Sequence, residues 1–248
     1  MADTEAPYQW AGDGSMPLTK NLPREIRIGF VRKVYSILTV QLMVTVAIAA
    51  PIAMQSFKWV QAHAWISLVA MCLYLVVACG MVCARSLMRT FPFNYIMLFT
   101  LTGALSIMVG FSSAAYTWQS VLLAAGLTTC VVAALTIYAW TTKTDFTGFG
   151  PYLMMALFTL IVFGIAISIM SMFGLNFKPL MLLYDALGVL LFSGYLIYDT
   201  QLVIGEMGGH QVEFSIDDYC MAAIQLYLDI INLFILILQL LGERRDSS

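Results

Sequence analysis

Charged side chains are scarce in this 248-residue chain: Asp, Glu, Lys and Arg together make up 10% of it, and hydrophobic residues make up 61%. An average soluble domain carries roughly 25% charged residues. The scarcity of charge therefore excludes a soluble globular enzyme and a disordered chain. With a formal net charge of −2, the chain also lacks the basic surface that binds nucleic acid, and we expect no nucleic-acid partner.

Motifs that carry catalysis or hold a cofactor are also missing. The chain contains no HExxH motif, GxSxG elbow or Walker-type phosphate loop, and its five cysteines form no CxxC pair. Tyr198-Asp199 matches the tyrosine-aspartate motif of presenilin-type proteases, but Asp229 lacks the Gly-x-Gly-Asp context of their second aspartate. We therefore predict neither an enzyme nor a resident cofactor.

What the chain does contain is seven apolar stretches, each about as long as the roughly 20 residues that cross a bilayer. They predict an all-α integral membrane protein, a bundle of seven transmembrane helices surrounded by lipid. We expect a flexible tail at residues 1–28, a membrane domain at 29–242 and a short tail at 243–248. The stretches lie near residues 34–56, 63–84, 94–113, 117–140, 151–173, 179–203 and 216–241.

The distribution of Lys and Arg predicts a cytosolic N-terminus, because these residues gather on the cytosolic side of membrane proteins. Of twelve such residues, eight lie on the N-terminal side of the membrane and four on the other if all seven stretches cross it. A last stretch that dips in and returns would change the ratio to ten against two. A re-entrant last segment therefore remains an alternative to seven full spans.

Three aspartates fall inside the last two apolar stretches, where a carboxylate costs about 2.5–3.5 kcal/mol on insertion scales. Asp185 and Asp199 are 14 residues apart, which places them on one face of a helix. A second polar stripe follows the last stretch and contains Asp218, Gln225, Asp229 and Asn232. Because a polar stripe avoids lipid and consecutive helices pack side by side, we expect the two stripes to face each other.

Asp199 and Asp229 are the acids that this arrangement brings to a similar depth. Two carboxylates in a medium of low dielectric share a proton and titrate as a pair, which makes a pH sensor. Once ionised, they offer the oxygen ligands that Ca²⁺ prefers, so transient Ca²⁺ binding is expected here. Arg89 or Arg85, at the end of the second stretch, is a candidate to latch one acid. Asp185 alone could instead be a packing residue that hydrogen-bonds across helices.

Four segments of the chain resemble one family. They are Ile28–Leu38 (IGFVRKVYSIL), Phe91–Tyr95 (FPFNY), Thr142–Gly150 (TKTDFTGFG) and the final pair, Ile197–Gln201 (IYDTQ) with Leu226–Phe234 (LYLDIINLF). With these the chain resembles the Bax-inhibitor family, also called the lifeguard family, and within it the Golgi anti-apoptotic protein branch.

The resemblance implies a seven-helix protein of the Golgi or endoplasmic reticulum that leaks Ca²⁺ in a pH-dependent way and suppresses apoptosis. It implies that Asp199 and Asp229 form the pH sensor and gate, with a latch at Arg89 or Arg85. Asp185, Asp218, Gln225 and Asn232 are then candidates to line the pore. Ca²⁺, protons and apoptosis-regulating membrane proteins are the expected partners. Two alternatives remain: an anti-apoptotic interaction protein without ion flux, and a proton-coupled Ca²⁺ exchanger.

Overall fold

Seven long helices dominate the structure, a computed structural model that describes residues 24–84, 88–175, 177–210 and 213–245. Each is long and apolar enough to cross a membrane, and each coincides with one predicted stretch, so the all-α membrane fold is confirmed. A short helix, α2 (Phe57–Ala62), joins the first two. The seven are α1 (Arg24–Ala53), α3 (Ala64–Cys83), α4 (Phe93–Ser113), α5 (Trp118–Thr141), α6 (Gly150–Met172), α7 (Lys178–Ile204) and α8 (Tyr219–Leu241).

Proline and glycine set several of these boundaries. Pro151 and Pro179 occupy the first turns of α6 and α7, where no backbone N–H is needed for the helix. α7 ends at Gly205, whose φ of 59° lies in the region that favours glycine. Pro51 lies in the last turn of α1, where it leaves the rest of the helix intact.

α1 begins at Arg24, well before the first predicted stretch near residue 34. Residues 24–28 of the predicted tail therefore belong to this helix, and residues 1–23 lie outside the described part of the chain. The buried side chains of α1 recur every three or four residues, and this stripe includes Arg27, Val34 and Gln41. The buried face of α1 thus continues beyond the apolar stretch, and Arg27 lies against the end of α7.

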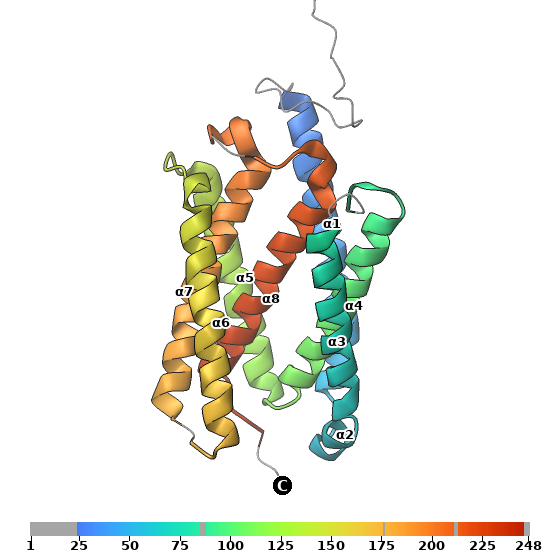
Figure 1. Cartoon of the computed structure of the whole chain (residues 1–248), viewed down its shortest axis with the longest axis vertical. Helices are drawn as coiled ribbons and strands as arrows, with labels where there is room; N and C mark the ends of the chain where they lie inside the picture. Colours follow the sequence, from blue (N-terminus) through green and yellow to red (C-terminus); the bar gives the residue numbers. More distant parts are fainter. Residues whose placement is uncertain (1–23, 85–87, 176, 211–212, 246–248) are drawn as a thin grey trace, which may run out of the picture.

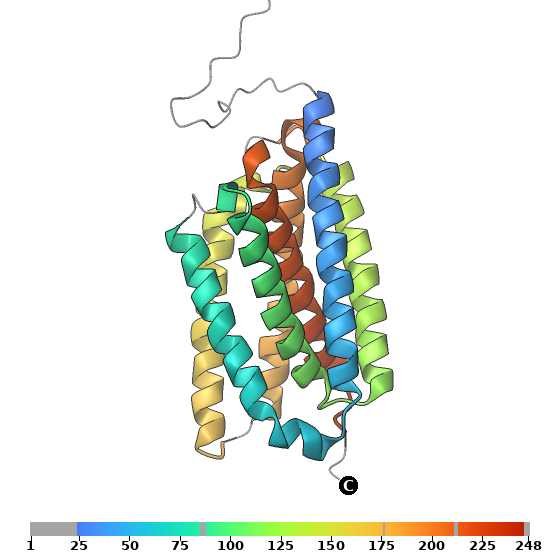
Figure 2. The same ribbon diagram turned by 90° about the vertical axis from the view of Figure 1, so that its right-hand side faces the viewer.

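α8 lies at the centre of the bundle, with α1, α4, α5 and α7 packed around it (Figures 1 and 2). It is a continuous helix of 23 residues, which corresponds to about 34 Å and exceeds the bilayer core. It runs from the end of the bundle where α1 begins to the opposite end (Figure 1). In the described residues, seven helices are therefore long and apolar enough to cross a membrane, and α8 does not turn back as the re-entrant alternative requires.

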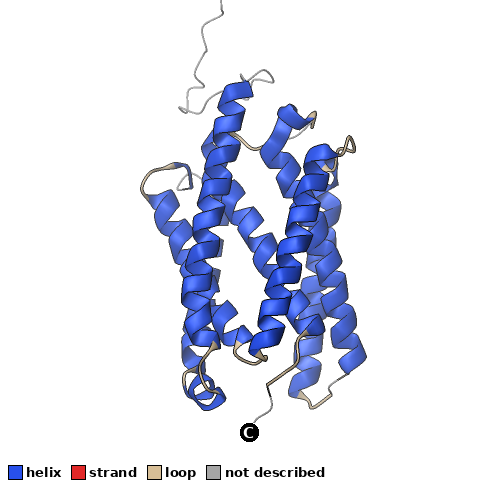
Figure 3. Ribbon diagram, turned by 180° about the vertical axis from the view of Figure 1, so that it is seen from behind, coloured by secondary structure: helices blue, strands red, loops and turns tan. Residues whose placement is uncertain are grey.

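We call the two ends of the bundle the Arg27 end and the Arg244 end, after one residue at each. The Arg27 end is where α1 begins, α7 ends and α8 begins, and the Arg244 end is where α8 ends. At the Arg244 end the chain leaves α8 as a short extended segment (Figure 3). Its isolated bridge between Tyr116 and Arg244 is the one β-type pairing in the described residues.

Polar side chains bind α1, α4 and α8 together on one side of the core. The Gln41 amide donates to the Thr102 hydroxyl at 2.9 Å, and the hydroxyl groups of Thr45 and Tyr227 lie 2.7 Å apart. Such bonds across membrane helices contribute about 1 kcal/mol each. Because Tyr227 and Asp229 point about 200° apart on α8, this closed side lies opposite the side that carries the aspartates.

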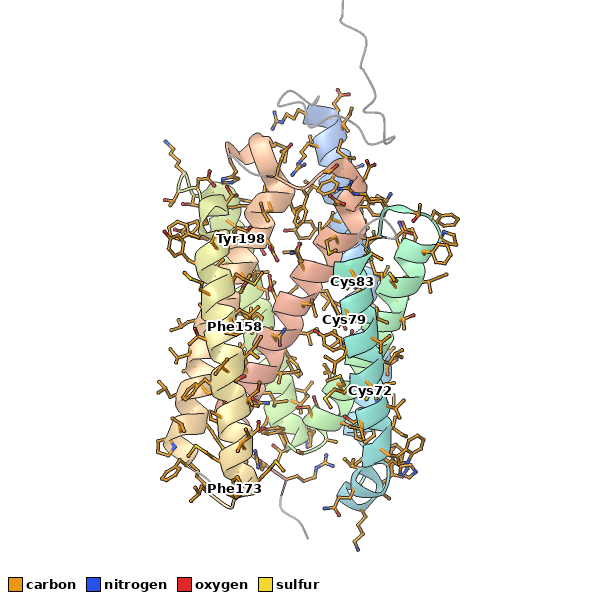
Figure 4. The ribbon with its side chains drawn as sticks, viewed as in Figure 1. Cys72, Cys79, Cys83, Phe158, Phe173 and Tyr198 are labelled. Carbon is orange, nitrogen blue, oxygen red and sulfur yellow. The ribbon has the colours of Figure 1, made fainter. Side chains whose placement is uncertain are left out.

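α3 and α6 flank the bundle and present apolar side chains outward. Phe158 of α6 and Phe173, which follows the end of α6, are 68% and 79% exposed, and Cys72 and Cys79 of α3 are free and exposed (Figure 4). Lipid is the environment that such a surface requires. α6 packs chiefly against α7, so the side of α8 between α3 and α6 is only partly covered.

Candidate functional site

Asp199 of α7 and Asp229 of α8 meet inside the bundle. Their side chains are 3% and 4% exposed, and the two carboxyl groups are hydrogen-bonded to each other. A hydrogen bond between two carboxyl groups requires a proton on one of them, because a carboxylate only accepts. The facing stripes expected from the sequence therefore bring these acids together as a pair that holds a proton.

A cavity of about 600 Å³ contains this pair. Gln225 and Asn232 of the α8 stripe line it, as do Tyr74 of α3 and a row of apolar residues from α6. Among the described residues, four buried oxygens at this site have no hydrogen-bond partner: Asp199 Oδ1, Asp229 Oδ2, Gln225 Oε1 and the hydroxyl of Tyr195. A set of unpaired acceptors beside one shared proton can receive a cation or water.

A second cavity, of about 1,310 Å³, continues from the first toward the Arg244 end. The two share lining residues Ile161, Tyr184 and Gln239, so they form adjoining parts of one space. The buried Asp185 lines the second cavity, with Lys178 and Arg244. In the described structure, two adjoining cavities thus extend between α6, α7 and α8 from the Arg244 end to the aspartate pair, with a few polar groups on largely apolar walls.

The Arg27 end is closed by the turn between α5 and α6. The side chain of Gln201, two residues beyond Asp199, accepts from the amide N–H of Phe146 at 2.7 Å and donates to the carbonyl oxygen of Thr144 at 2.9 Å. Within the same turn, Asp145 accepts from the amide and hydroxyl of Thr147. Gln201 therefore pins this turn over the end of α7, directly beyond the pair.

Arg27 closes the same end from the α1 side. Its guanidinium is 4% exposed and donates to the carbonyl oxygens of Leu202, Ile204 and Phe214 at 2.7, 3.2 and 2.7 Å. It also lies 3.6 Å from the carboxylate of Glu213. The last carbonyl groups of a helix have no partner within the helix and favour a cation. Arg27 supplies both a donor and a positive charge to the end of α7.

Of the two candidate latch residues, Arg89 and Arg85, the structure describes only Arg89. Arg89 donates to both carboxylate oxygens of Asp218, at 2.8 and 3.0 Å, at the start of α8. The structure therefore pairs Arg89 with Asp218 rather than with Asp199 or Asp229. Asp218 lies at the Arg27 end and does not belong to the lining of either cavity described above. Arg85 lies outside the described residues.

Three residues at the site were not predicted from the sequence: Arg27, Tyr195 and Gln239. Arg27 continues the buried stripe of α1, and that spacing was the available signal. Tyr195 precedes Asp199 by one helical turn, which is the same face of α7. Gln239 lies ten residues beyond Asp229 on α8 and lines both cavities; the signal was a polar side chain in an otherwise apolar part of the helix.

The pair offers limited coordination for a metal ion. In the part of the chain that the structure describes, no three His, Cys, Asp or Glu side chains form a cluster. Ca²⁺ takes six to eight oxygen ligands in a stable site. Two carboxylates with the side-chain amides of Gln225 and Asn232 nearby offer fewer oxygen ligands than such a site uses.

Comparison with known proteins connects this arrangement to one family. The family model described as "Inhibitor of apoptosis-promoting Bax1" matches residues 27–246. "Protein lifeguard 3" of Homo sapiens is 37% identical over 227 residues, which cover 89% of this chain and 70% of the relative. "Protein LIFEGUARD 4" of Arabidopsis thaliana is 37% identical over 236 residues, which cover 92% of this chain and 90% of the relative. The matched region includes all seven long helices.

Proposed function

The chain belongs to the Bax-inhibitor family of anti-apoptotic membrane proteins, and from this premise we propose that it is a pH-sensitive Ca²⁺-leak path of intracellular membranes. Its role is transport rather than catalysis. By lowering the Ca²⁺ content of its store, it suppresses apoptosis. Golgi and endoplasmic reticulum are the proposed locations, and apoptosis-regulating membrane proteins are its proposed partners.

The single observation that carries the proposal is the hydrogen-bonded pair of Asp199 and Asp229 within connected cavities. A proton held between the two carboxyl groups ties α7 to α8. Loss of that proton leaves two carboxylates that repel each other in a medium of low dielectric, unless a cation lies between them. Acid therefore favours the closed pair, and a higher pH favours separation of the helices and entry of Ca²⁺.

The Arg27 end is the second closure that such a path requires. Gln201 and Arg27 bind the last turn of α7 to the α5–α6 turn and to α1. Asp199 lies in the turn just before it. When the pair ionises and α7 shifts, the contacts of Gln201 and Arg27 shift with it. These contacts form the seal at the Arg27 end, and the pair acts on this seal through a rigid helix.

The orientation follows from the distribution of cations. Arg24, Arg32, Lys33 and Lys143 lie near the Arg27 end, which we therefore place in the cytosol. The cavities then extend from the pair toward the lumen. Store Ca²⁺ would reach Asp185 first and the pair next, and the pair would respond to protons.

Calcium flux into liposomes tests the proposal. Purified protein is compared between pH 5 and 8 with the Asp199→Asn/Asp229→Asn double variant, and with Asp217→Asn as a control for loss of charge outside the cavities. We expect flux of the wild type and of the control to rise with pH, and the double variant to lose that response. An unchanged pH response in the double variant contradicts the gate. No flux from folded wild type supports the interaction-protein alternative.

A proton-coupled exchanger is the second candidate, because a buried proton beside unpaired carboxyl oxygens also suits exchange of a proton for Ca²⁺. An exchanger would accumulate Ca²⁺ against its gradient when only a proton gradient is imposed. A leak path would equalise Ca²⁺ on the two sides. Liposomes with equal Ca²⁺ inside and outside and a pH step distinguish the two.

A further inference from the structure

The four residues after α8, Gly242–Arg245, form an extended segment that we call the C-terminal strap. Its main chain is bound at several points to the turn between α4 and α5. The amide of Thr117 donates to the carbonyl oxygen of Glu243 at 3.0 Å, and the amide of Arg245 donates to that of Ala115 at 2.9 Å. The predicted tail at 243–248 is thus ordered and docked as far as Arg245, the last described residue.

Side-chain contacts fix the strap further. The amide of Glu243 donates to the hydroxyl of Ser120, and the guanidinium of Arg245 donates to the carbonyl oxygen of Gln55, both at 2.9 Å. Gly242 permits the close approach: a Cβ there would meet the carbonyl oxygen of Leu238, and the ring of Tyr116 at 2.6 Å. The strap is therefore held against three parts of the bundle.

Arg244 is the strap residue whose side chain lines the second cavity. It is the charged group that attracts the buried carboxyl group of Asp185, which lines the same cavity from α7. The exposed Lys178 adds a second positive charge to that lining. At its outer part, a route proposed for Ca²⁺ thus carries two cations, and the charge of Arg244 acts on the acid that would attract the ion.

We propose that Arg244 excludes cations from the second cavity while the strap is docked, and that undocking of the strap is an outer gate in series with the aspartate pair. The conduction part of this inference rests on the proposed function. Undocking would remove the charge of Arg244 from the cavity, and Asp185 would then face the entrance with Lys178 as the remaining cation of the lining. The route would then change from repelling to attracting Ca²⁺.

The electrostatic part can be measured without any ion flux. Full-length protein is prepared with its five native cysteines replaced by alanine and with Ser168→Cys, a near-isosteric change in the wall of the second cavity. The introduced thiol is labelled with a cationic trimethylammonium and an anionic sulfonate methanethiosulfonate. The ratio of the two labelling rates reports the charge at the cavity wall.

Arg244→Gln is expected to raise the cationic-to-anionic ratio about fivefold. Arg244→Lys should preserve the wild-type ratio, because it retains the charge. Lys58→Gln, which removes an exposed positive charge on α2 outside both cavities, is the matched control and should leave the ratio unchanged. Gly242→Ala keeps every charge but displaces the strap, and it should act in the same direction as Arg244→Gln.

Calcium flux of the same variants completes the test. A raised ratio together with roughly threefold faster Ca²⁺ flux in Arg244→Gln supports the outer gate. A ratio that does not change overturns the inference, whatever the flux. A raised ratio with measurable but unaltered flux also overturns it as a gate. A raised ratio with no flux from any variant upholds cation exclusion by Arg244 and refutes the proposed leak path instead.

Discussion

Arg27, in the first turn of α1, donates a 2.7 Å hydrogen bond to the carbonyl oxygen of Leu202 in the last turn of α7, across 175 residues of sequence. This contact joins the first and sixth spanning helices at the cytosolic end that we propose. It lies three residues along α7 from Asp199. The seal and the aspartate pair are therefore parts of one short segment of helix.

Replacement of Arg27 should destabilise the fold. Arg27→Ala would leave three buried or half-buried carbonyl groups, and the carboxylate of Glu213, without this donor. We expect a loss of about 3 kcal/mol, because removal of one partner from a buried charged cluster leaves the other groups uncompensated. Thermal unfolding in detergent measures it. The exposed Arg24→Ala is the control, and an equal melting temperature for the two variants would refute this role.

Two glycines with positive φ provide a matched comparison at the same end. Gly205 and Gly209 have φ of 59° and 82°. A Cβ at Gly205 would meet Arg27 Nη2 at 2.6 Å and the carboxylate of Glu213, whereas a Cβ at Gly209 would meet nothing within 4 Å. Gly209→Ala should cost about 1 kcal/mol through backbone strain alone. Gly205→Ala should cost clearly more, and equal unfolding free energies would show that Arg27 and Glu213 do not crowd this site.

Because Gln201 holds the α5–α6 turn, its removal should speed amide hydrogen exchange in that turn. In Gln201→Ala the amide of Phe146 loses its acceptor, so its hydrogen exchange should accelerate by about tenfold or more. Exchange in α1 should stay the same. Gln61→Ala, at an exposed position of α2, serves as the control. Unaltered exchange of the α5–α6 turn in Gln201→Ala would mean that this turn is held by other contacts.

The hydroxyl network on the closed side of α8 should contribute modestly to stability. Thr45→Val removes the bond to the hydroxyl of Tyr227 and the acceptor of Ser106, at a cost of about 1 kcal/mol. Thr39→Val is a suitable control, because Thr39 is exposed and donates only to the carbonyl oxygen of Tyr35 in its own helix. Chemical unfolding of the two variants should differ, and the same midpoint for both would remove the network as a source of stability.

The sequence was most informative where physical constraints act within one helix. Length and hydropathy located all seven spans, and the spacing of Asp199 and Asp229 within polar stripes predicted that they face each other. The partner of Arg89 could not be predicted from the sequence, because the choice between Asp218 and the pair depends on how far α3 and α8 extend at their ends.

Contacts that depend on loops could not be read from periodicity. Gln201 is hydrogen-bonded to the α5–α6 turn, and residues 242–245 are docked on the turn between α4 and α5. Both contacts join segments that are far apart in the chain and carry no repeating pattern. Arg27 was counted only as an orienting charge. A charged residue within an apolar stripe of three- and four-residue spacing indicates a buried partner, and Arg27 occupies such a position on α1.

Infrared spectroscopy of the reconstituted protein, recorded with Ca²⁺ flux during one pH titration, tests the central claim most directly. The protonated carboxyl group shared by Asp199 and Asp229 has a carbonyl stretch that carboxylates lack. The account predicts that this band disappears as pH rises, at the same midpoint at which flux increases, and that Asp199→Asn/Asp229→Asn lacks both changes. A band that persists while flux rises, or one that disappears without any change in flux, would contradict the account.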